Sequence, residues 1–193
     1  DFLPSAAQTP AWELANKFDA QDQTAIFCSF SKVTFGGGGL SFAAAGTKLF
    51  DLLSKQRASM IVCSDKVNQL RHLGFLKNKA EVENHMKKHA DLVRPKFEAA
   101  FNALDAMSPE IGNYKKPTGG YFISFNASKP IAKRVIELCK EAGVLITPAG
   151  STYPHFNDPQ DSNIRLAPTF LGLDDLKEAM EVFTTALIIA FEE

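Results

Sequence analysis

The sequence predicts an α/β fold in which a long helix joins two parts. Short apolar runs rich in β-formers alternate with segments whose apolar residues recur every three or four positions, a mixture typical of α/β proteins. Between residues 80 and 107 the helical spacing continues almost without interruption, which predicts one long amphipathic helix. The period changes after residue 108, so we expect domains at residues 1–108 and 109–193.

The first part is predicted to contain a pair of strands followed by two helices. Residues 24–30 form a short apolar run of β-formers, so we expect a buried strand there. Four glycines, Gly36–Gly39, precede a second expected strand at 40–45, so the two strands meet at a glycine-rich connection. Helical spacing predicts the two helices, at 47–56 and 66–76.

The long helix contains Pro95, and a compact second unit follows it. Proline lacks the N–H that bonds to the carbonyl four residues earlier, so we expect a kink or a break at Pro95. From about residue 118 the pattern predicts the order β-α-β-β-α. The elements are expected at 121–126, 131–142, 144–147, 163–167 and 173–191.

Composition excludes several classes of function. Twenty-one Lys and Arg residues against 22 Asp and Glu residues give a net charge of −1, so nucleic acid and anionic membranes are not expected partners. The longest apolar run, near residues 185–191, is too short to span a bilayer. Cys28, Cys63 and Cys139 are far apart and odd in number, so we expect reduced, buried thiols in a cytoplasmic protein.

The segment from Cys28 to Gly39 is the most informative in the sequence. It places Lys32 at the end of an apolar strand, with Ser29 and Ser31 within three residues and four glycines behind it. Partial burial of an amine favours its neutral, nucleophilic form, which condenses with aldehydes. The two hydroxyls can donate hydrogen bonds to a phosphate, and glycines let the backbone approach a ligand closely. From spacing alone, an exposed lysine in a hairpin connection explains the segment equally well.

Ser29-x-x-Lys32 also has the spacing of the nucleophile motif in penicillin-recognising enzymes. That chemistry needs a serine at a helix start, together with Ser-Asp-Asn and Lys-Thr-Gly segments. In this sequence Lys66 follows Ser64 and Asp65, and no Lys-Thr-Gly occurs. The sequence therefore argues against this alternative.

Arg165 is the second candidate. It alternates with Ile164 and Leu166, so its side chain is expected on the face opposite theirs. A guanidinium held on a short strand can bind the carboxylate of an amino-acid or oxo-acid substrate with two hydrogen bonds. A salt bridge to an internal Asp or Glu is the alternative that this segment alone leaves open.

His85 and His89 are four residues apart on one face of the long helix, as a pair of metal ligands would be. The zinc-hydrolase motif needs Glu directly after the first His, and Met86 occupies that position. We therefore expect a solvated helix face and no metal site. Arg71 and His72, on the preceding helix, can face a partner or a ligand, and the sequence does not decide.

Four segments together resemble the C-terminal half of a fold-type-I, pyridoxal-phosphate-dependent aminotransferase of the aspartate-aminotransferase-like group. Ser29-Phe-Ser-Lys32 is similar to the family's cofactor-lysine motif. The segment at 117–122 (Pro-Thr-Gly-Gly-Tyr-Phe) resembles the start of its small domain, and 147–153 resembles its substrate-pocket turn. Asn-Ile-Arg-Leu-Ala at 163–167 is similar to its carboxylate-binding strand. Their order and separations agree across nearly the whole chain.

The resemblance implies both a fold and a set of roles. Residues 1–108 would be the end of the large domain plus a linking helix, and 109–193 the small C-terminal α/β domain. Lys32 would bind pyridoxal phosphate as the internal aldimine and move the proton between substrate Cα and cofactor C4′, while Ser29 and Ser31 would bind the phosphate. Arg165 would bind the substrate carboxylate. The implied activity is amino transfer between an amino acid, such as aspartate or glutamate, and a 2-oxo acid, in a homodimer.

Two departures from the family pattern affect these expectations. Leu40 stands where the family usually has a phosphate-binding arginine, and Asp1-Phe-Leu-Pro does not match the family's Asp-x-x-Tyr segment. The sequence is therefore expected to be a fragment that carries part of the site, binds pyridoxal phosphate weakly if at all, and is inactive alone. Another reaction of the same cofactor, such as decarboxylation or elimination, and a non-catalytic regulatory domain are the alternatives.

Overall fold

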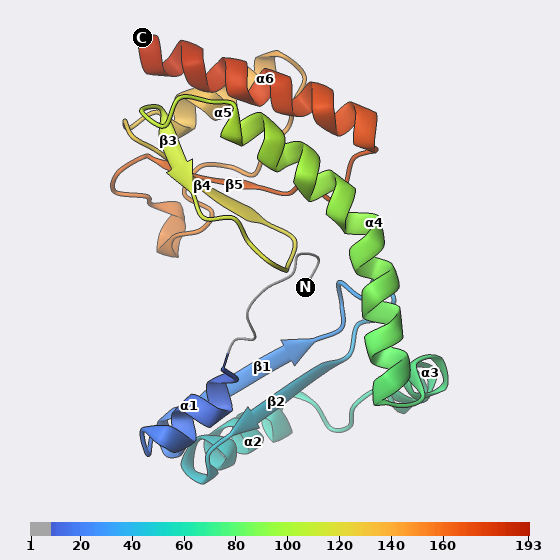
Figure 1. Cartoon of the computed structure of the whole chain (residues 1–193). Helices are drawn as coiled ribbons and strands as arrows, with labels where there is room; N and C mark the ends of the chain where they lie inside the picture. Colours follow the sequence, from blue (N-terminus) through green and yellow to red (C-terminus); the bar gives the residue numbers. More distant parts are fainter. Residues whose placement is uncertain (1–8) are drawn as a thin grey trace. The chain divides into compact units, whose positions relative to one another are not determined.

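A computed structural model describes residues 9–193 and divides the chain into two compact units (Figure 1). Among the described residues, one unit extends to His89 and the other runs from Ala90 to Glu193. The division falls inside the helix α4 (Lys79–Asp105), to which both units contribute. The sequence-based division at 108 and 109 lies beyond the end of this helix and stays a prediction.

The first unit is built on an antiparallel strand pair. β1 (Ala25–Ser29) pairs with β2 (Ser41–Ala45) so that Ser29 lies opposite Ser41, which confirms the two strands predicted around the glycine run. The expected burial of the first strand is wrong, because the side chain of Phe27 is 68% exposed. Among the described residues the sheet has only two strands, so much of its surface is uncovered.

One helix precedes this pair, and two follow it as the sequence predicts. They are α1 (Ala11–Lys17), α2 (Thr47–Met60) and α3 (Lys66–Leu76), with a short 3₁₀ turn, η1 (Gln21–Gln23), before β1. The carboxylate of Asp65 caps α3 by accepting a 2.9 Å hydrogen bond from the N–H of Asn68. The amphipathic helix α4 follows.

The helix α4 continues through Pro95, so of the predicted kink or break the break is not observed. Proline removes one hydrogen bond from the helix, but the surrounding turns are held by the core of the second unit. Val93 is buried, and the side chains of Phe97 and Ala100 are fully buried. Packing of this apolar face therefore outweighs the lost hydrogen bond.

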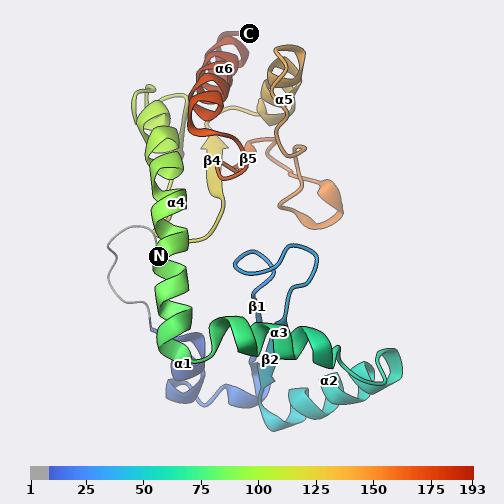
Figure 2. The same ribbon diagram turned by 90° about the vertical axis from the view of Figure 1, so that its right-hand side faces the viewer.

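The second unit is a three-stranded antiparallel sheet with two further helices. Its strands, β3 (Gly112–Tyr114), β4 (Ile123–Ala127) and β5 (Asn163–Leu166), are in the order β3-β4-β5. The helices α5 (Ala132–Glu141) and α6 (Leu173–Glu192) pack beside each other (Figures 1 and 2), and η2 (Pro154–Phe156) is a short 3₁₀ turn. Phe125 on β4 contacts Phe183 on α6, which places the core between this sheet and α6.

Two details of the second unit differ from the predicted order. Residues 144–147 are not a strand, because this apolar segment lines a cavity beside α6 and pairs with no described strand. The strand β3 was not expected, since Gly112–Tyr114 has no strand-like pattern of its own. It forms by pairing with β4, and a Cβ at Gly112 would lie 2.5 Å from the carbonyl oxygen of Asn126, so the pairing needs glycine.

The cysteines follow the prediction only in part. All three are free thiols, but Cys28 and Cys63 are exposed and only Cys139 is buried. Burial raises the pKa of the Cys139 thiol to about 11. Within residues 9–193 no helix has both the length and the apolarity that crossing a membrane requires.

Candidate active site

Lys32 lies in a tight turn directly after β1, in the loop that joins β1 to β2. We call residues 30–40 the lysine loop. The carbonyl of Phe30 accepts hydrogen bonds from the N–H groups of Val33 (2.9 Å) and Thr34 (3.0 Å), so the chain reverses around Lys32. The N–H of Phe30 donates to the carbonyl of Leu40 at 2.8 Å and closes the base of the loop. Backbone bonds therefore fix the chain on both sides of Lys32.

The two candidate serines lie together beside this turn. The Oγ of Ser29 donates to the Oγ of Ser31 at 2.9 Å and accepts from the N–H of Ser31 at 3.1 Å. Gly39 packs against Ser31 so closely that a Cβ there would lie 2.6 Å from the Cβ of Ser31. The loop closes in this way only because residue 39 is glycine. Two hydroxyls and one amine thus come from four consecutive residues.

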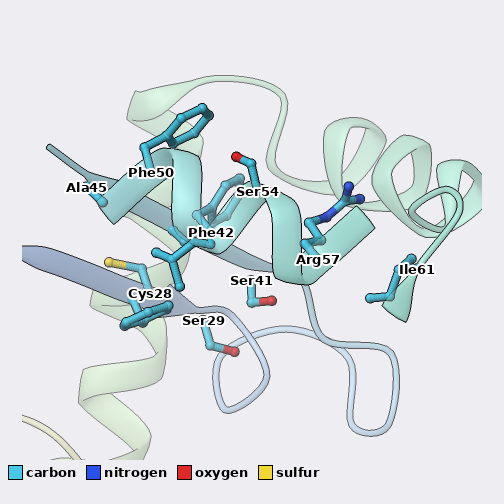
Figure 3. A pocket seen from close by; sticks show the side chains of 12 residues that line it. Cys28, Ser29, Ser41, Phe42, Ala45, Phe50, Ser54, Arg57 and Ile61 are labelled. Carbon is cyan, nitrogen blue, oxygen red and sulfur yellow. The ribbon is translucent and has the colours of Figure 1, made fainter. Parts of the chain in front are cut away.

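The side chains of Ser29, Ser31 and Lys32 are all exposed. Within residues 9–193 the side chain of Lys32 is thus exposed, and the predicted partial burial of its amine is not observed. Ser29 also lines an open pocket of about 690 Å³ between the strand pair and α2 (Figure 3). Ser41 and Arg57 contribute polar atoms to this pocket, and its other walls are largely apolar.

Two histidines that the sequence did not connect with Lys32 contact the lysine loop. His72, on α3, is only 3% exposed, and its Nε2 lies 2.8 Å from the hydroxyl of Thr34. The Nε2 of His85, on α4, donates to the carbonyl of Val33 at 2.6 Å. The interpretation of His85 as part of a solvated helix face is therefore wrong.

Aromatic rings surround both histidines. His72 contacts Phe35 with ring centres 5.1 Å apart, Phe35 contacts Phe75 at 5.3 Å, and Phe75 contacts His85 at 5.0 Å. Phe75 follows His72 closely in the sequence, but Phe30 and Phe35 precede it by more than a helix length, so local spacing gave no signal that joins the cluster to the lysine loop. Within residues 9–193 no group of three or more His, Cys, Asp or Glu side chains is arranged to hold a metal ion.

Arg165 lies on β5 in the second unit, as predicted on the face opposite Ile164 and Leu166. Those two side chains are 1% and 5% exposed, and Arg165 is half-buried. The Cζ of Arg165 lies 4.7 Å from the ring centre of Phe122, an arrangement that holds the guanidinium by cation–π attraction. Its Nε is buried and has no hydrogen-bond partner. Within residues 9–193 Arg165 forms no ion pair, so the internal salt bridge is not observed.

Buried polar contacts fix the strand that carries Arg165. The Nδ2 of Asn163 donates to the Oγ of Ser124 (2.9 Å) and to the Oδ1 of Asn126 (2.8 Å), both on β4. Its Oδ1 accepts a 2.7 Å hydrogen bond from the hydroxyl of Thr152. Asn163 therefore joins β5 both to β4 and to the 147–153 turn.

Asp158 holds the start of the same strand. Its carboxylate accepts hydrogen bonds from the N–H groups of Gln160 (3.0 Å), Ser162 (2.9 Å) and Asn163 (2.8 Å). Burial alone would raise the pKa of Asp158, but these backbone donors hold the pKa below its usual value. The charged carboxylate therefore stabilises the turn at residues 158–163 that leads into β5.

The structure brings three of the four motif segments together. Phe122, from the 117–122 segment, contacts Arg165, and Thr152, from the 147–153 turn, contacts Asn163. Thr147 and Arg165 also line one cavity of about 110 Å³. The Lys32 segment belongs to the other unit and is described by its own contacts.

The motifs and the geometry of each unit agree with a comparison against known families. The sequence matches the family described as aspartate amino-transferase over residues 8–193. The chain belongs to this aspartate aminotransferase family. Its α/β architecture matches the C-terminal portion of aminotransferase structures, which confirms the fold class that the sequence predicts.

Individual members of the family show how much of an aminotransferase the chain represents. It is 37% identical over 169 residues to an aspartate aminotransferase of Corynebacterium glutamicum, a match that covers 86% of the chain and 39% of that relative. A solved structure of a candidate aminotransferase from Corynebacterium diphtheriae matches with a TM-score of 0.85 and 36% identity, covering 93% of the chain and 45% of that protein. The chain spans about two fifths of the length of the curated relatives it matches.

A more distant relative has a different name. The chain is 24% identical over 165 residues to the HTH-type transcriptional regulator NorG of Staphylococcus aureus, a match that covers 84% of the chain and 36% of the regulator. Sequences like this aminotransferase-family chain therefore also occur in a protein named for regulation of transcription.

Proposed function

We propose that the full-length protein is a pyridoxal-phosphate-dependent aminotransferase that moves an amino group between an amino acid and a 2-oxo acid. Membership of the aspartate aminotransferase family supports this proposal. The observation that carries it is the group of Ser29, Ser31 and Lys32 at the end of β1 and in the backbone-fixed turn that follows it. An amine beside two hydroxyls matches the aldehyde and the phosphate of that cofactor.

The residues of the lysine loop fit pyridoxal phosphate by their chemistry. In the proposed roles, Lys32 binds the aldehyde carbon and moves the proton at the α-carbon of the substrate. Ser29 and Ser31 donate hydrogen bonds to the phosphate, because their hydroxyls lie 2.9 Å apart and are exposed. When bound, pyridoxal phosphate supplies the electron sink for bond breaking at the substrate α-carbon.

Arg165 binds the α-carboxylate of the substrate in this proposal. Three observations support that role: the guanidinium is half-buried, it has no carboxylate partner within residues 9–193, and Phe122 holds it from one side. A planar guanidinium matches a carboxylate with two parallel hydrogen bonds. Every amino acid and every 2-oxo acid carries such a group, so one arginine serves both halves of an amino transfer.

The proposed substrates are a dicarboxylic pair, with aspartate or glutamate as the amino donor. The name of the Corynebacterium glutamicum relative supports aspartate. We further propose a homodimer and a cytoplasmic location. The exposed free thiols of Cys28 and Cys63 support a reducing compartment.

A transfer assay on the full-length protein tests the proposed function. Aspartate or glutamate is supplied with pyridoxal phosphate and a 2-oxo acid, and the new amino acid is quantified for the wild type and for Lys32→Ala. We expect amino transfer by the wild type and its loss in Lys32→Ala. Decarboxylation or elimination products in place of a new amino acid would instead support another reaction on the same fold.

The relative NorG favours a second candidate, a regulatory domain derived from the same fold. The two candidates differ in what they require of Lys32. If the full-length protein regulates transcription without amino transfer, and Lys32→Ala leaves that regulation intact, the regulatory candidate is correct and the enzymatic one is wrong.

A further inference from the structure

The lysine loop is held to two helices by side chains that none of the proposed roles uses. His85, on α4, donates its Nε2 proton to the carbonyl of Val33, the residue directly after Lys32. A carbonyl only accepts, so the 2.6 Å contact requires the proton on Nε2. The ring of His85 is half-buried against Phe75, which fixes its direction. This bond therefore restrains the peptide group that follows Lys32.

His72 makes the equivalent contact one residue further along the loop. Its Nδ1 lies 2.9 Å from the carbonyl of Asn68 and must carry a proton, while its Nε2 lies 2.8 Å from the hydroxyl of Thr34. That hydroxyl also lies 3.1 Å from the carbonyl of Phe30, the acceptor that closes the turn around Lys32. His72 is almost fully buried, so its contact with Thr34 is shielded from water.

The far end of the loop is anchored to the same helix. The Nδ2 of Asn68 donates to the carbonyl of Gly39 at 3.1 Å, and the guanidinium of Arg71 lies over the ring of Phe35, with 5.5 Å between its Cζ and the ring centre. The loop that carries Lys32 is thus bound to α3 and α4 at several successive points.

We propose that His85 and His72 are positioning residues that fix the turn around Lys32 and so set where its amine lies. The role assigned to Lys32 rests on the proposed function, whereas the anchoring of the loop does not. Neither imidazole touches a reacting group in this proposal. Each acts through the backbone or hydroxyl of Val33 and Thr34.

Two variants of His85 in the full-length protein separate the hydrogen bond from the packing of the ring. His85→Phe keeps an aromatic ring beside Phe75 but removes the donor, and His85→Gln keeps an N–H donor at a similar distance from the backbone. Thr34→Val and Thr34→Ser form a matching pair for the His72 contact, because only serine retains the hydroxyl.

The first measurement is amide hydrogen exchange of residues 30–40 in the protein without cofactor. We expect exchange roughly fivefold to tenfold faster in His85→Phe and Thr34→Val, the size of effect that losing one hydrogen bond produces. His85→Gln and Thr34→Ser should remain close to the wild type. Equal exchange in all four variants and the wild type would overturn the proposal, whatever the protein does with pyridoxal phosphate.

The second measurement is the rate at which added pyridoxal phosphate becomes attached to Lys32, followed by borohydride trapping and peptide mass. Misplacement of a reacting group by about 1 Å can cost about 100-fold, so we expect a rate reduced tenfold or more in His85→Phe and recovered in His85→Gln. An equal loss in both variants would mean that the ring only supports folding, and the proposal would fail. No trapping at Lys32 in the wild type would refute the proposed function instead, and the exchange measurement would still decide the anchoring.

Discussion

At the scale of single residues, Arg165 has the clearest expected effect on activity. Arg165→Lys keeps the charge but loses the planar pair of donors, so carboxylate binding weakens. We expect kcat/KM of the full-length protein to fall by about 10- to 100-fold, with similar losses for the amino acid and for the 2-oxo acid. Steady-state kinetics with each substrate varied in turn provide the measurement.

A second arginine provides the matched control for this prediction. Arg134 bonds to the carboxylate of Glu193 at 2.8 Å on the surface of the same unit, so Arg134→Lys should leave both KM values close to those of the wild type. If Arg165→Lys behaves like Arg134→Lys, Arg165 does not bind the substrate carboxylate.

Asp105 gives a prediction about stability and pH. Its carboxylate accepts hydrogen bonds from Lys116 (2.5 Å) and from Tyr114 (2.6 Å), and these bonds lower the pKa of Asp105 from its usual 3.8. Because the pKa of Asp105 is lower in the folded state than in the unfolded state, this carboxylate stabilises the folded state at pH values above its unfolded pKa. That stabilisation is lost as the pH falls through its folded pKa. Because the side chain is 46% exposed, we expect Asp105→Asn to cost only about 0.5–1 kcal/mol at pH 7.

Chemical denaturation of Asp105→Asn and the wild type, repeated from pH 7 down to pH 3, measures this difference in the free energy of unfolding. The difference in the free energy of unfolding between Asp105→Asn and the wild type should become smaller as the pH falls. Within residues 9–193 Asp174 pairs with Lys177 alone, on the helix surface, and is 93% exposed, so Asp174→Asn is the control with little effect at any pH. A difference in the free energy of unfolding that stays constant with pH would show that these hydrogen bonds do not lower the pKa of Asp105.

Single residues also show where sequence reasoning succeeds and where it stops. The side of β5 on which Arg165 lies was predictable, because alternation along a strand is a local property. The roles of His72 and His85 were not, since Thr34 is 38 residues from His72 and Val33 is 52 residues from His85. Spacing within one helix cannot show contacts made across such separations.

At the scale of elements, the lysine loop depends on one glycine more than on its neighbours. A Cβ at Gly39 would lie 2.6 Å from the Cβ of Ser31, whereas a Cβ at Gly36 would have no atom within 4 Å. We expect Gly39→Ala to destabilise the protein by about 1–3 kcal/mol and to weaken binding of pyridoxal phosphate by the full-length protein. Gly36→Ala should change neither.

Thermal unfolding and titration with the cofactor measure both effects of these glycine variants. Equal stability and equal affinity for Gly39→Ala and Gly36→Ala would show that the close packing of Gly39 on Ser31 is unimportant. In the sequence the four glycines form one group. The structure shows that Gly39 differs from Gly36 because it packs against Ser31.

Helices and strands with a regular spacing of apolar residues were predicted well. Strands that depend on a neighbouring strand were not. The long helix and the two strands around the glycine run came from local patterns and are present. The apolar segment 144–147 has the composition of a strand, but it lines a cavity beside α6 and pairs with no strand among residues 9–193. β3 has no such composition, and it forms because it pairs with the edge of β4.

At the scale of the whole molecule, the first unit leaves large apolar side chains exposed around the strand that precedes Lys32. Phe27, Phe42 and Phe50 are 68%, 52% and 54% exposed, and all three line the pocket beside α2. Apolar surface of this extent usually has a partner. Since the chain spans about two fifths of its curated relatives, we propose that other parts of the full-length protein cover it and complete the cofactor site.

This proposal predicts a difference between the 193-residue chain and the full-length protein. We expect the chain alone, mixed with stoichiometric pyridoxal phosphate, to show no absorbance band that depends on Lys32. The full-length protein should show such a band. A Lys32-dependent band of equal strength in both would mean that residues 1–193 hold the cofactor without help.

The proposed function depends most on Lys32, which we propose is the residue that holds pyridoxal phosphate. The most direct test reduces the complex of the full-length protein and pyridoxal phosphate with borohydride, digests it, and locates the modified lysine by mass spectrometry. We expect modification of the peptide that contains Lys32 and its absence in Lys32→Ala. Modification at a different lysine, or an unchanged yield in Lys32→Ala, would contradict the proposed role of Lys32.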